Sequence, residues 1–437
     1  MRIVYKTSGG LDVHKKNVVA CRMKMGAHGK KVRETHTFGT TTAALLELSD
    51  WLGEWSIEHV ALESTGEYWK PIYNVLEEQF KLVLVNAHHV KHVPGRKTDV
   101  KDAEWLAELQ MYGLLKASFV PPPGQRVLRV LTRNRTKLVQ ERARIINRLQ
   151  KILEEANLKL ASVVSDVMGR SGRLILEALV AGEQDPVELA QLAHGSLRDK
   201  KAALVEALTG NVQPHHLFLL KQHLEHFDFL TQQIDAVSQR IAEQIVELDD
   251  QEPPPPSADN SDDAGLEPLT YTAALNCLET IPGVSRRIAE VIVAELGVDM
   301  ARFPSAKQAA AWSGVTPGIE ESAGKRKSTK AKPGNQPLKT TLTQAAWAAS
   351  HTKDTYLAAQ YRRLAPRRGR KRAIVAVAHS ILVSAYFMLK HHVPYQELGS
   401  DYFDQRKQSA VVSRLVRRIK KLGFDVELTA IATAPTT

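Results

Sequence analysis

Cysteine is scarce in this chain of 437 residues: Cys21 and Cys277 stand far apart and form no CxxC pair. We therefore expect neither a disulfide framework nor a structural zinc site, and a reducing compartment fits this usage. Long hydrophobic runs are also missing. The most apolar stretch, residues 373–389, contains a histidine and two serines and stops short of the roughly 18 residues of a membrane span. We interpret it as a buried helix. Residues 1–10 lack the apolar segment of a signal peptide, so no membrane partner is expected.

Acidic residues are the minority charge, with 48 Asp and Glu against 59 Lys and Arg and a net charge of +11. A basic surplus of this size favours a polyanionic partner such as nucleic acid. Hydrophobic residues make up 43% of the chain, which supplies real cores and argues against intrinsic disorder. The length exceeds that of one ordinary domain, so we expect two or three domains.

The N-terminal part alternates strand and helix patterns. Alternating apolar segments predict five strands, at residues 10–13, 17–23, 31–38, 59–63 and 81–85. Amphipathic segments predict helices at residues 42–52 and 68–76. This order is that of a ribonuclease H-like (RuvC-like) domain, an α/β fold in which helices cover a mixed sheet. Gly9-Gly10 lacks the rest of any phosphate-loop signature, and we assign it no role.

The remainder of the chain is predicted to be helical. Apolar residues at spacings of three, four and seven predict two long helices, spanning Leu131–Leu160 and Leu220–Leu248. Such spacings place the apolar residues along one side of each helix. These apolar sides could pack together in an antiparallel hairpin within one chain or in a coiled coil between chains. We expect a ribonuclease H-like domain at 1–120, a helical coiled-coil segment for dimerisation and nucleic-acid binding at 121–250, a linker at 251–267, and a mostly helical domain at 268–437.

A turn in the C-terminal part resembles a helix-hairpin-helix element. Ile281-Pro282-Gly283-Val284 separates two predicted helices, and its glycine would let backbone amides approach a phosphate. An ordinary glycine-closed turn between helices is the alternative. Arg286 and Arg287 follow after Ser285 and are candidates for phosphate contacts.

Four acids are the candidates for chemistry. Asp12 lies on the first predicted strand, Glu63 ends the fourth, and Asp99 and Asp102 flank a helix start. An apolar strand rarely ends in an unpaired carboxylate unless a cation meets it. Two aspartates three residues apart on one helical face also repel each other without a cation. The hard ion Mg²⁺ prefers such oxygen ligands. Helix capping remains the alternative for each acid taken alone.

The motifs around these acids resemble those of a known family. LDVHK, ALESTGEYW and GRKTDVKDAEWLA are similar to the DEDD motifs of the insertion-sequence transposases that work with a bridge RNA. Residues 312–325 resemble the C-terminal transposase domain of that family, which continues into a basic segment, a Gly-Asn pair and a helix beginning with Leu. Here Gly334-Asn335 and Leu338 take those places.

The resemblance implies a DNA transposase guided by a structured RNA. Such an enzyme would cut and rejoin donor and target double-stranded DNA as a homodimer or homotetramer, in the bacterial cytoplasm and at the nucleoid. The resemblance also implies catalytic Mg²⁺ ligands, namely Asp12, Glu63, Asp99 and Asp102, and Ser322 as the nucleophile. The family's usual double serine is Glu321-Ser322 here and its first glycine is Ala323. Ser328 therefore stays the alternative nucleophile.

Basic clusters are the second indication of a nucleic-acid partner. Residues 126–151 contain nine Lys or Arg against one acid, and residues 362–372 contain seven with no acid. Such runs favour contacts with phosphates, although a solvated surface is the alternative. Our candidates for nucleic-acid binding are Arg126, Arg129, Arg133, Arg142, Arg144, Arg286, Arg287, Lys325, Arg326, Lys327, Arg367, Arg368, Arg370, Lys371 and Arg372.

Two other functions fit part of the pattern. A structure-selective, junction-resolving nuclease would use Mg²⁺ and the four acids without Ser322. A catalytically inactive nucleic-acid-binding protein would keep the fold and the basic clusters alone. Loss of activity on Ser322→Ala separates the transposase from the nuclease, and loss of cleavage on chelating Mg²⁺ separates both from the binding protein.

Overall fold

The computed structural model describes residues 3–26, 29–64, 66–86, 102–251, 268–317, 320–322, 325–328 and 334–429, with the backbone alone at 64, 320–322 and 325–328. The chain divides into two compact units, Met1–Pro121 and Pro122–Thr437. Asp99 and nearly all of the predicted linker at 251–267 lie outside the described residues.

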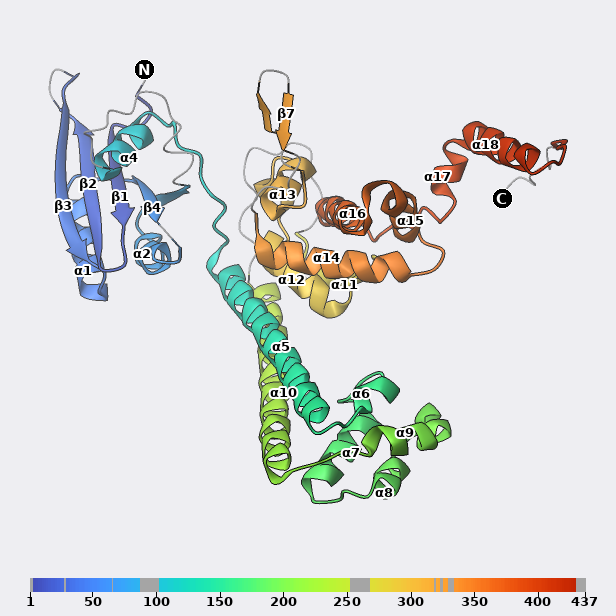
Figure 1. Ribbon diagram of the computed structural model, residues 1–437. Coiled ribbons are helices and arrows are strands. Elements are labelled where there is room, and N and C mark those ends of the chain that lie inside the picture. Colours follow the sequence, from blue (N-terminus) through green and yellow to red (C-terminus); the bar gives the residue numbers. More distant parts are fainter. Residues whose placement is uncertain are drawn as a thin grey trace. The chain divides into compact units, whose positions relative to one another are not determined.

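The first unit is built on a five-stranded mixed sheet with the order β3-β2-β1-β4-β5 (Figure 1). Its strands are β1 (Thr7–Val13), β2 (Asn17–Met25), β3 (Lys31–Gly39), β4 (His59–Ser64) and β5 (Lys81–Val85). The pairs β1–β2 and β2–β3 are antiparallel, whereas β1–β4 and β4–β5 are parallel. The five predicted strands and the mixed α/β sheet are confirmed.

Helices cover both faces of this sheet. The helices α1 (Thr42–Gly53) and α2 (Trp69–Leu76) pack on one face, against inward-pointing residues such as Leu11 and Val13. The helix α4 (Asp102–Met111) packs on the other face. Successive strand residues point to opposite faces, so Ser8, Gly10 and Asp12 all lie on the α4 side of β1.

Gly10 sets the distance between α4 and the sheet. A Cβ atom at this position would lie 2.2 Å from the Ala103 carbonyl oxygen and 2.4 Å from the Ala107 nitrogen. The Ser8 hydroxyl donates a hydrogen bond of 2.8 Å to the Ala107 carbonyl inside the same contact. The backbone of α4 therefore rests directly on β1. Assigning Gly10 no role was wrong, because only a residue without a side chain allows this approach.

The second unit contains a long two-helix arm, formed by α5 (Pro123–Glu155) and α10 (Pro214–Asp249) lying side by side and antiparallel (Figure 1). At its far end are α6 (Leu160–Val163), α7 (Arg170–Val180), α8 (Pro186–Gln191), η2 (Gly195–Lys200) and α9 (Lys201–Leu208). Leu160 was predicted to continue the first long helix and instead belongs to α6. The chain turns at Asn157, whose φ of 55° is incompatible with a continuing helix.

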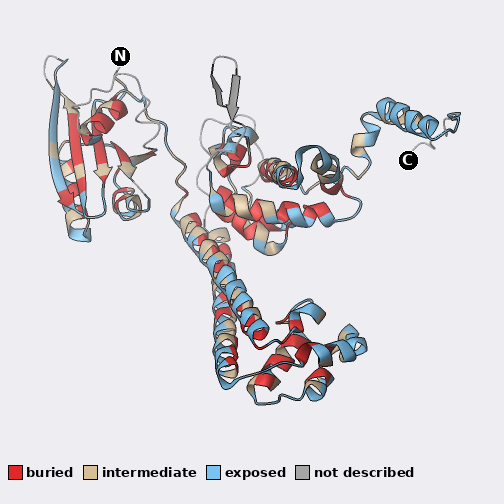
Figure 2. Cartoon of the chain, viewed as in Figure 1, coloured by how far each residue is buried: buried red, intermediate tan, exposed pale blue. Residues whose placement is uncertain are grey.

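In its described residues, the rest of the second unit is helical apart from one hairpin. It contains α11 (Tyr271–Glu279), α12 (Arg286–Leu296), η3 (Met300–Arg302), α13 (Ala306–Ser313), β6 (Glu320–Ser322), β7 (Lys325–Ser328), α14 (Gln336–His351), α15 (Tyr356–Arg368), α16 (Arg370–His391), α17 (Tyr402–Gln405) and α18 (Gln408–Lys421). The mostly helical remainder is thus confirmed. Figure 2 shows α18 exposed along its length, with no buried residue.

The helix α16 is the centre of this region. It contacts α11, α13, α14 and α15, and ten of its 22 residues are buried. Within the described part of the chain it alone has the length and apolarity of a membrane span, and 56% of its most apolar window is buried in the protein. Its packing is that of a core helix, as the interpretation of residues 373–389 requires.

The close approach at Gly10 predicts a stability effect. Gly10→Ala should destabilise the first unit by about 1–3 kcal/mol, because the methyl group must push α4 away from β1. Urea unfolding followed by circular dichroism measures this. Gly53→Ala is the matched control: no atom lies within 4 Å of a Cβ there, so this variant should be neutral or slightly more stable. Equal stability of Gly10→Ala and the parent would contradict the packing argument.

Candidate active site and nucleic-acid interface

Two of the predicted acids lie side by side on the sheet. Asp12 of β1 and Glu63 of β4 are direct partners in the parallel register of these strands. Neighbouring strands are about 4.8 Å apart and partnered residues point to the same face, so both side chains lie on the α4 side. This pairing follows from the fold, since the two acids are 51 positions apart in the sequence.

Asp102 approaches the same place from α4. It occupies the first turn of that helix, and its charge raises the pKa of Asp12. Because Gly10 and Ser8 hold α4 against β1, the beginning of α4 is kept near the end of β1. Three of the four predicted acids are therefore brought together, and Asp99 lies outside the described residues.

The electrostatics of Asp12 suit a cation. Its side chain is 24% exposed, and burial is the largest influence that raises its pKa above the ordinary value of 3.8. His14 opposes the shift through an Nε2–Oδ2 contact of 3.2 Å, whereas Asp102 adds to it. A half-buried carboxylate beside two other acids is stabilised when a cation binds. The oxygen ligands fit a hard divalent ion.

Ser322 lies on the small β6–β7 hairpin of the second unit, which extends away from α13 and α14 in Figure 1. Ser322 pairs with Lys325 next to the turn, whereas the alternative nucleophile Ser328 pairs with Glu320 at the other end of the ladder. The two candidate serines are thus separated by the length of the hairpin. The cations Lys325, Arg326 and Lys327 belong to β7, of which the backbone alone is described.

Several arginines of α5 that we expected to bind nucleic acid contact other parts of the protein. Arg129 and Arg133 form ion pairs with the buried Glu295 of α12. Arg142 donates a 3.2 Å hydrogen bond to the Thr231 hydroxyl of α10 and lies over the Phe227 ring. Arg129 and Arg133 join α5 to α12, because a buried carboxylate needs a cation, and Arg142 joins α5 to α10. Arg126 is half-buried on the same helix.

A different set of α5 cations faces solvent. Lys137, Arg144, Arg148 and Lys151 are exposed, and successive spacings of seven, four and three place them on one helical face. Within the described residues none of the four forms an ion pair. Arg144 was among our candidates, whereas the other three were counted only as part of the basic run. Their shared face was the missed signal, and we call it the α5 stripe.

The predicted helix-hairpin-helix turn has a packing role. Gly283 has a φ of +85°, and a Cβ there would lie 2.5 Å from both the Ala345 carbonyl oxygen and the Ala349 nitrogen of α14. The side of Gly283 that would have to face a phosphate is therefore covered by α14. This packing agrees with the alternative interpretation, an ordinary glycine-closed turn between helices. Arg286 donates to Asn276 and pairs with Glu279. Arg287 is exposed in the first turn of α12.

The junction of α15 and α16 is a strongly basic corner. The two helices are separated by Gly369, whose φ is +80°. The cations on both sides of it are exposed, and they comprise Arg367, Arg368, Arg370, Lys371 and Arg372. The N-terminus of α16 carries no side-chain cap. Exposed cations beside free helix N–H groups are suited to phosphate oxygens.

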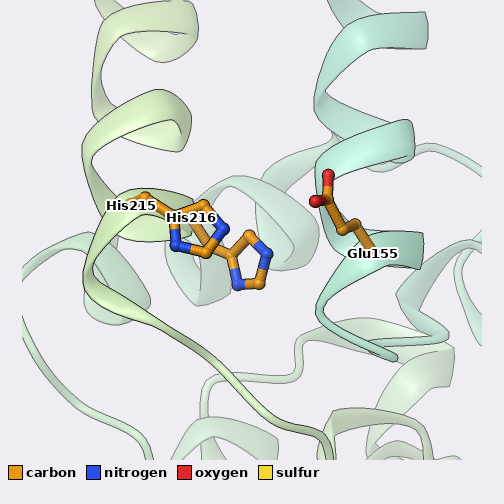
Figure 3. Close-up of side chains that lie close together, drawn as sticks. All are labelled: Glu155, His215 and His216. Atoms are coloured by element: carbon orange, nitrogen blue, oxygen red, sulfur yellow. The ribbon is translucent and has the colours of Figure 1, made fainter.

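One further cluster lies at the far end of the arm. Glu155 of α5 and His215 and His216 of α10 bring possible ligand atoms within 4.8 Å of one another (Figure 3). His216 Nδ1 accepts a hydrogen bond from the Gln213 N–H, so the neutral ring carries its proton on the buried Nε2. Neither nitrogen then offers a lone pair, and the cluster does not fit a metal in this arrangement.

Two family models match the chain. Residues 9–158 match the DEDD transposase domain of IS110 elements, described as a transposase, and residues 275–362 match the transposase IS116/IS110/IS902 family. The first match contains the four acids and the second contains Ser322. A DEDD transposase domain indicates dependence on a divalent metal. None of the curated proteins compared with the chain matches it.

The geometry of the acids predicts a dependence of stability on divalent metal. Because the folded-state pKa of Asp12 is raised, its ionised form opposes folding once the pH rises above its unfolded pKa of 3.8. Asp12→Asn should therefore be at least as stable as the parent at pH 7 without metal. Adding Mg²⁺ should raise the melting temperature of the parent but not of Asp12→Asn.

Thermal unfolding at several Mg²⁺ concentrations measures both effects. The control is Asp50→Asn, which removes an exposed acid of α1 and should keep the parent's response to Mg²⁺. A parental metal response in Asp12→Asn would remove this residue from the site.

Proposed function

This chain is an insertion-sequence transposase of the IS110 type, and we propose that it cuts and rejoins DNA strands with Mg²⁺ and a serine nucleophile. The observation that supports this most directly is the pairing of Asp12 with Glu63 on neighbouring strands. The charge of Asp102 also acts on the Asp12 carboxylate. The strand order of the first unit also supports a ribonuclease H-like fold, in which such acids form the metal site.

The four acids would share the work of holding the metal. Asp12 and Glu63 would contribute carboxylates from the sheet and Asp102 from α4, and we assign Asp99 to the same site. When bound, Mg²⁺ would stabilise the negative charge that develops on the attacked phosphate. The raised pKa of Asp12 means that proton release accompanies metal binding when the pH lies near that pKa.

Ser322 would act as the nucleophile of strand exchange. Its Oγ–H bond breaks, an Oγ–P bond forms, and the bond from phosphorus to one deoxyribose oxygen breaks, so that this oxygen takes up a proton. A serine hydroxyl is weakly nucleophilic until a base or metal activates it. Attack by a deoxyribose hydroxyl on the same phosphorus would release Ser322 and rejoin DNA without an external energy source.

The basic surfaces would hold the nucleic acids. We assign the α5 stripe to a structured guide RNA, and the α15–α16 corner together with Arg287 to the phosphates of donor and target DNA. Exposed cations that pair with no described acid support these assignments, since phosphate contacts supply most of the affinity for nucleic acids. We expect the protein to act in the cytoplasm as a homodimer or homotetramer.

The first prediction from this function concerns the covalent step. The parent should form a protein–DNA adduct that resists denaturation, and Ser322→Ala should abolish it, because no other hydroxyl then occupies the turn end of the hairpin. The adduct is measured by gel electrophoresis with labelled DNA under denaturing conditions. Ser328→Ala is the matched control, from the other end of the same hairpin, and should retain the adduct.

Two outcomes would change the assignment. An adduct that survives in Ser322→Ala and vanishes in Ser328→Ala makes Ser328 the nucleophile. DNA cleaved at the parental rate by Ser322→Ala, with no adduct in any variant, favours the junction-resolving nuclease.

The second prediction concerns the α5 stripe. Replacing Lys137, Arg144, Arg148 and Lys151 with Gln retains good helix propensity and should leave folding intact. RNA affinity should fall, and the log–log slope of affinity against salt should flatten by about 0.7–0.9 for each phosphate that is no longer neutralised by a cation. Filter binding with the RNA that co-purifies with the protein measures this slope.

The control for the stripe uses cations of η2, at the far end of the arm. Arg198→Gln with Lys200→Gln alters two exposed residues of η2 beside Asp199, and its salt slope should match that of the parent. An unchanged slope in the stripe variant would show that this face is only solvated.

A further inference from the structure

Glu295 is the most deeply buried acid among the described residues, with 0% of its side chain exposed. Arg133 of α5 donates from Nε at 2.7 Å and from Nη2 at 2.9 Å to its two carboxylate oxygens. Arg129 approaches with Nε at 3.2 Å and also donates to the backbone carbonyls of Ala294 and Glu295. The end of α12 is thus bound to α5 by charge-assisted hydrogen bonds.

A third group reaches the same carboxylate from the loop that carries the serine hairpin. The Asn335 amide donates from Nδ2 to Glu295 Oε2 at 2.6 Å. Its Oδ1 caps α14 by accepting the Leu338 N–H at 3.1 Å, and its own N–H donates to the Trp312 carbonyl at 3.0 Å. Asn335 therefore links α14, α13 and the Glu295 carboxylate at one point.

The two ends of the hairpin segment meet next to Asn335. A Cβ at Gly334 would lie 2.4 Å from the Gly314 nitrogen, so these two backbones touch with no side chain between them. Gly314 ends α13 in the left-handed region, with a φ of 74°. Residues 314 and 334 therefore form a closed base, and β6 and β7 lie between them in the chain.

We propose that Glu295 is a positioning residue, which fixes the base of the serine hairpin to α5 through Asn335 on one side and two arginines on the other. The inference rests on the proposed role of Ser322. Arg129 adds a second connection, because its guanidinium lies 5.5 Å from the centre of the Trp312 ring, and the Trp312 carbonyl accepts the Asn335 N–H.

This arrangement connects the nucleic-acid surface to the nucleophile. The α5 stripe and the Glu295 pairs belong to one continuous helix of 33 residues. RNA that fixes the orientation of α5 would thereby fix the base of the hairpin. Misplacing a reacting group by about 1 Å can slow a reaction about 100-fold, so a connection at the base is enough to control the covalent step.

The same two helices provide a matched comparison. Arg135 of α5 and Glu290 of α12 form a second buried ion pair of 2.6 Å. Glu290 contacts Arg286 of its own helix as well, and among the described residues it forms no ion pair with residues 312–317 or 334–335. This pair therefore reports what a buried ion pair between α5 and α12 contributes without the connection to the hairpin.

The decisive variant is Asn335→Ser. Serine caps a helix about as well as asparagine, but its short side chain cannot reach Glu295. We expect a lower melting temperature, because the buried Glu295 carboxylate loses one charge-assisted donor. RNA and DNA binding should be unchanged, and adduct formation per folded molecule should be slowed about 10- to 100-fold. Hydrogen exchange of backbone amides in 314–335 should become faster. Glu290→Gln should lower the melting temperature yet form the adduct at the parental rate per folded molecule.

The outcomes separate the inference from the function on which it rests. Parental adduct formation and parental exchange in Asn335→Ser would overturn the positioning role, as would equal slowing by Glu290→Gln and Glu295→Gln at matched folded fractions. If the parent forms no adduct, the nucleophile assignment fails and the positioning role falls with it, even where exchange in 314–335 still responds to Asn335→Ser.

Discussion

A carboxylate removed from water needs a cation nearby, and this constraint organises both units of the protein. In the second unit the chain supplies the cations itself, because Arg129 and Arg133 surround Glu295 and Arg135 meets Glu290. In the first unit Asp12 has a histidine at 3.2 Å, yet burial and a neighbouring acid still raise its pKa. The ion pairs of the second unit hold α5 and α12 together. The acids around Asp12 in the first unit form a site whose negative charge is best balanced by a cation from solution.

The same constraint explains why a count of basic residues overestimates a nucleic-acid surface. The run from 126 to 151 has nine cations, but those nearest α12 are used inside the protein. Only residues farther along α5 leave a continuous exposed face. The helical face that a residue occupies, together with its position along the helix, separates the two groups, because Arg142 contacts α10 although it lies between Lys137 and Arg144 of the α5 stripe. That information resides in the contacts of α5 with α12 and α10.

Local pattern was sufficient for the sheet. Alternating apolar residues placed all five strands, with Asp12 on the first and Glu63 at the end of the fourth. Features that depend on a distant partner were not predictable. Gly10 is required because α4, which lies 93 or more positions later in the sequence, packs against it. Leu160 does not belong to the first long helix, because Asn157 adopts a left-handed backbone conformation that ends this helix. By pattern alone Glu295 is one more polar residue of an amphipathic helix, and only the folded chain brings α5 and Asn335 to it.

The helix α5 is therefore more than a spacer. Its first turns are fixed to α12 and, through Glu295, to the base of the serine hairpin, while its later turns pack on α10 and expose the α5 stripe. Charge-assisted pairs hold the first turns of α5, and α10 packs along its later turns, so bending the helix would disturb one of these sets of contacts. An event that reorients the stripe must therefore either carry the hairpin base with it or break the Glu295 cluster. Because breaking that cluster would leave a buried charge without its partners, moving together is the less costly response.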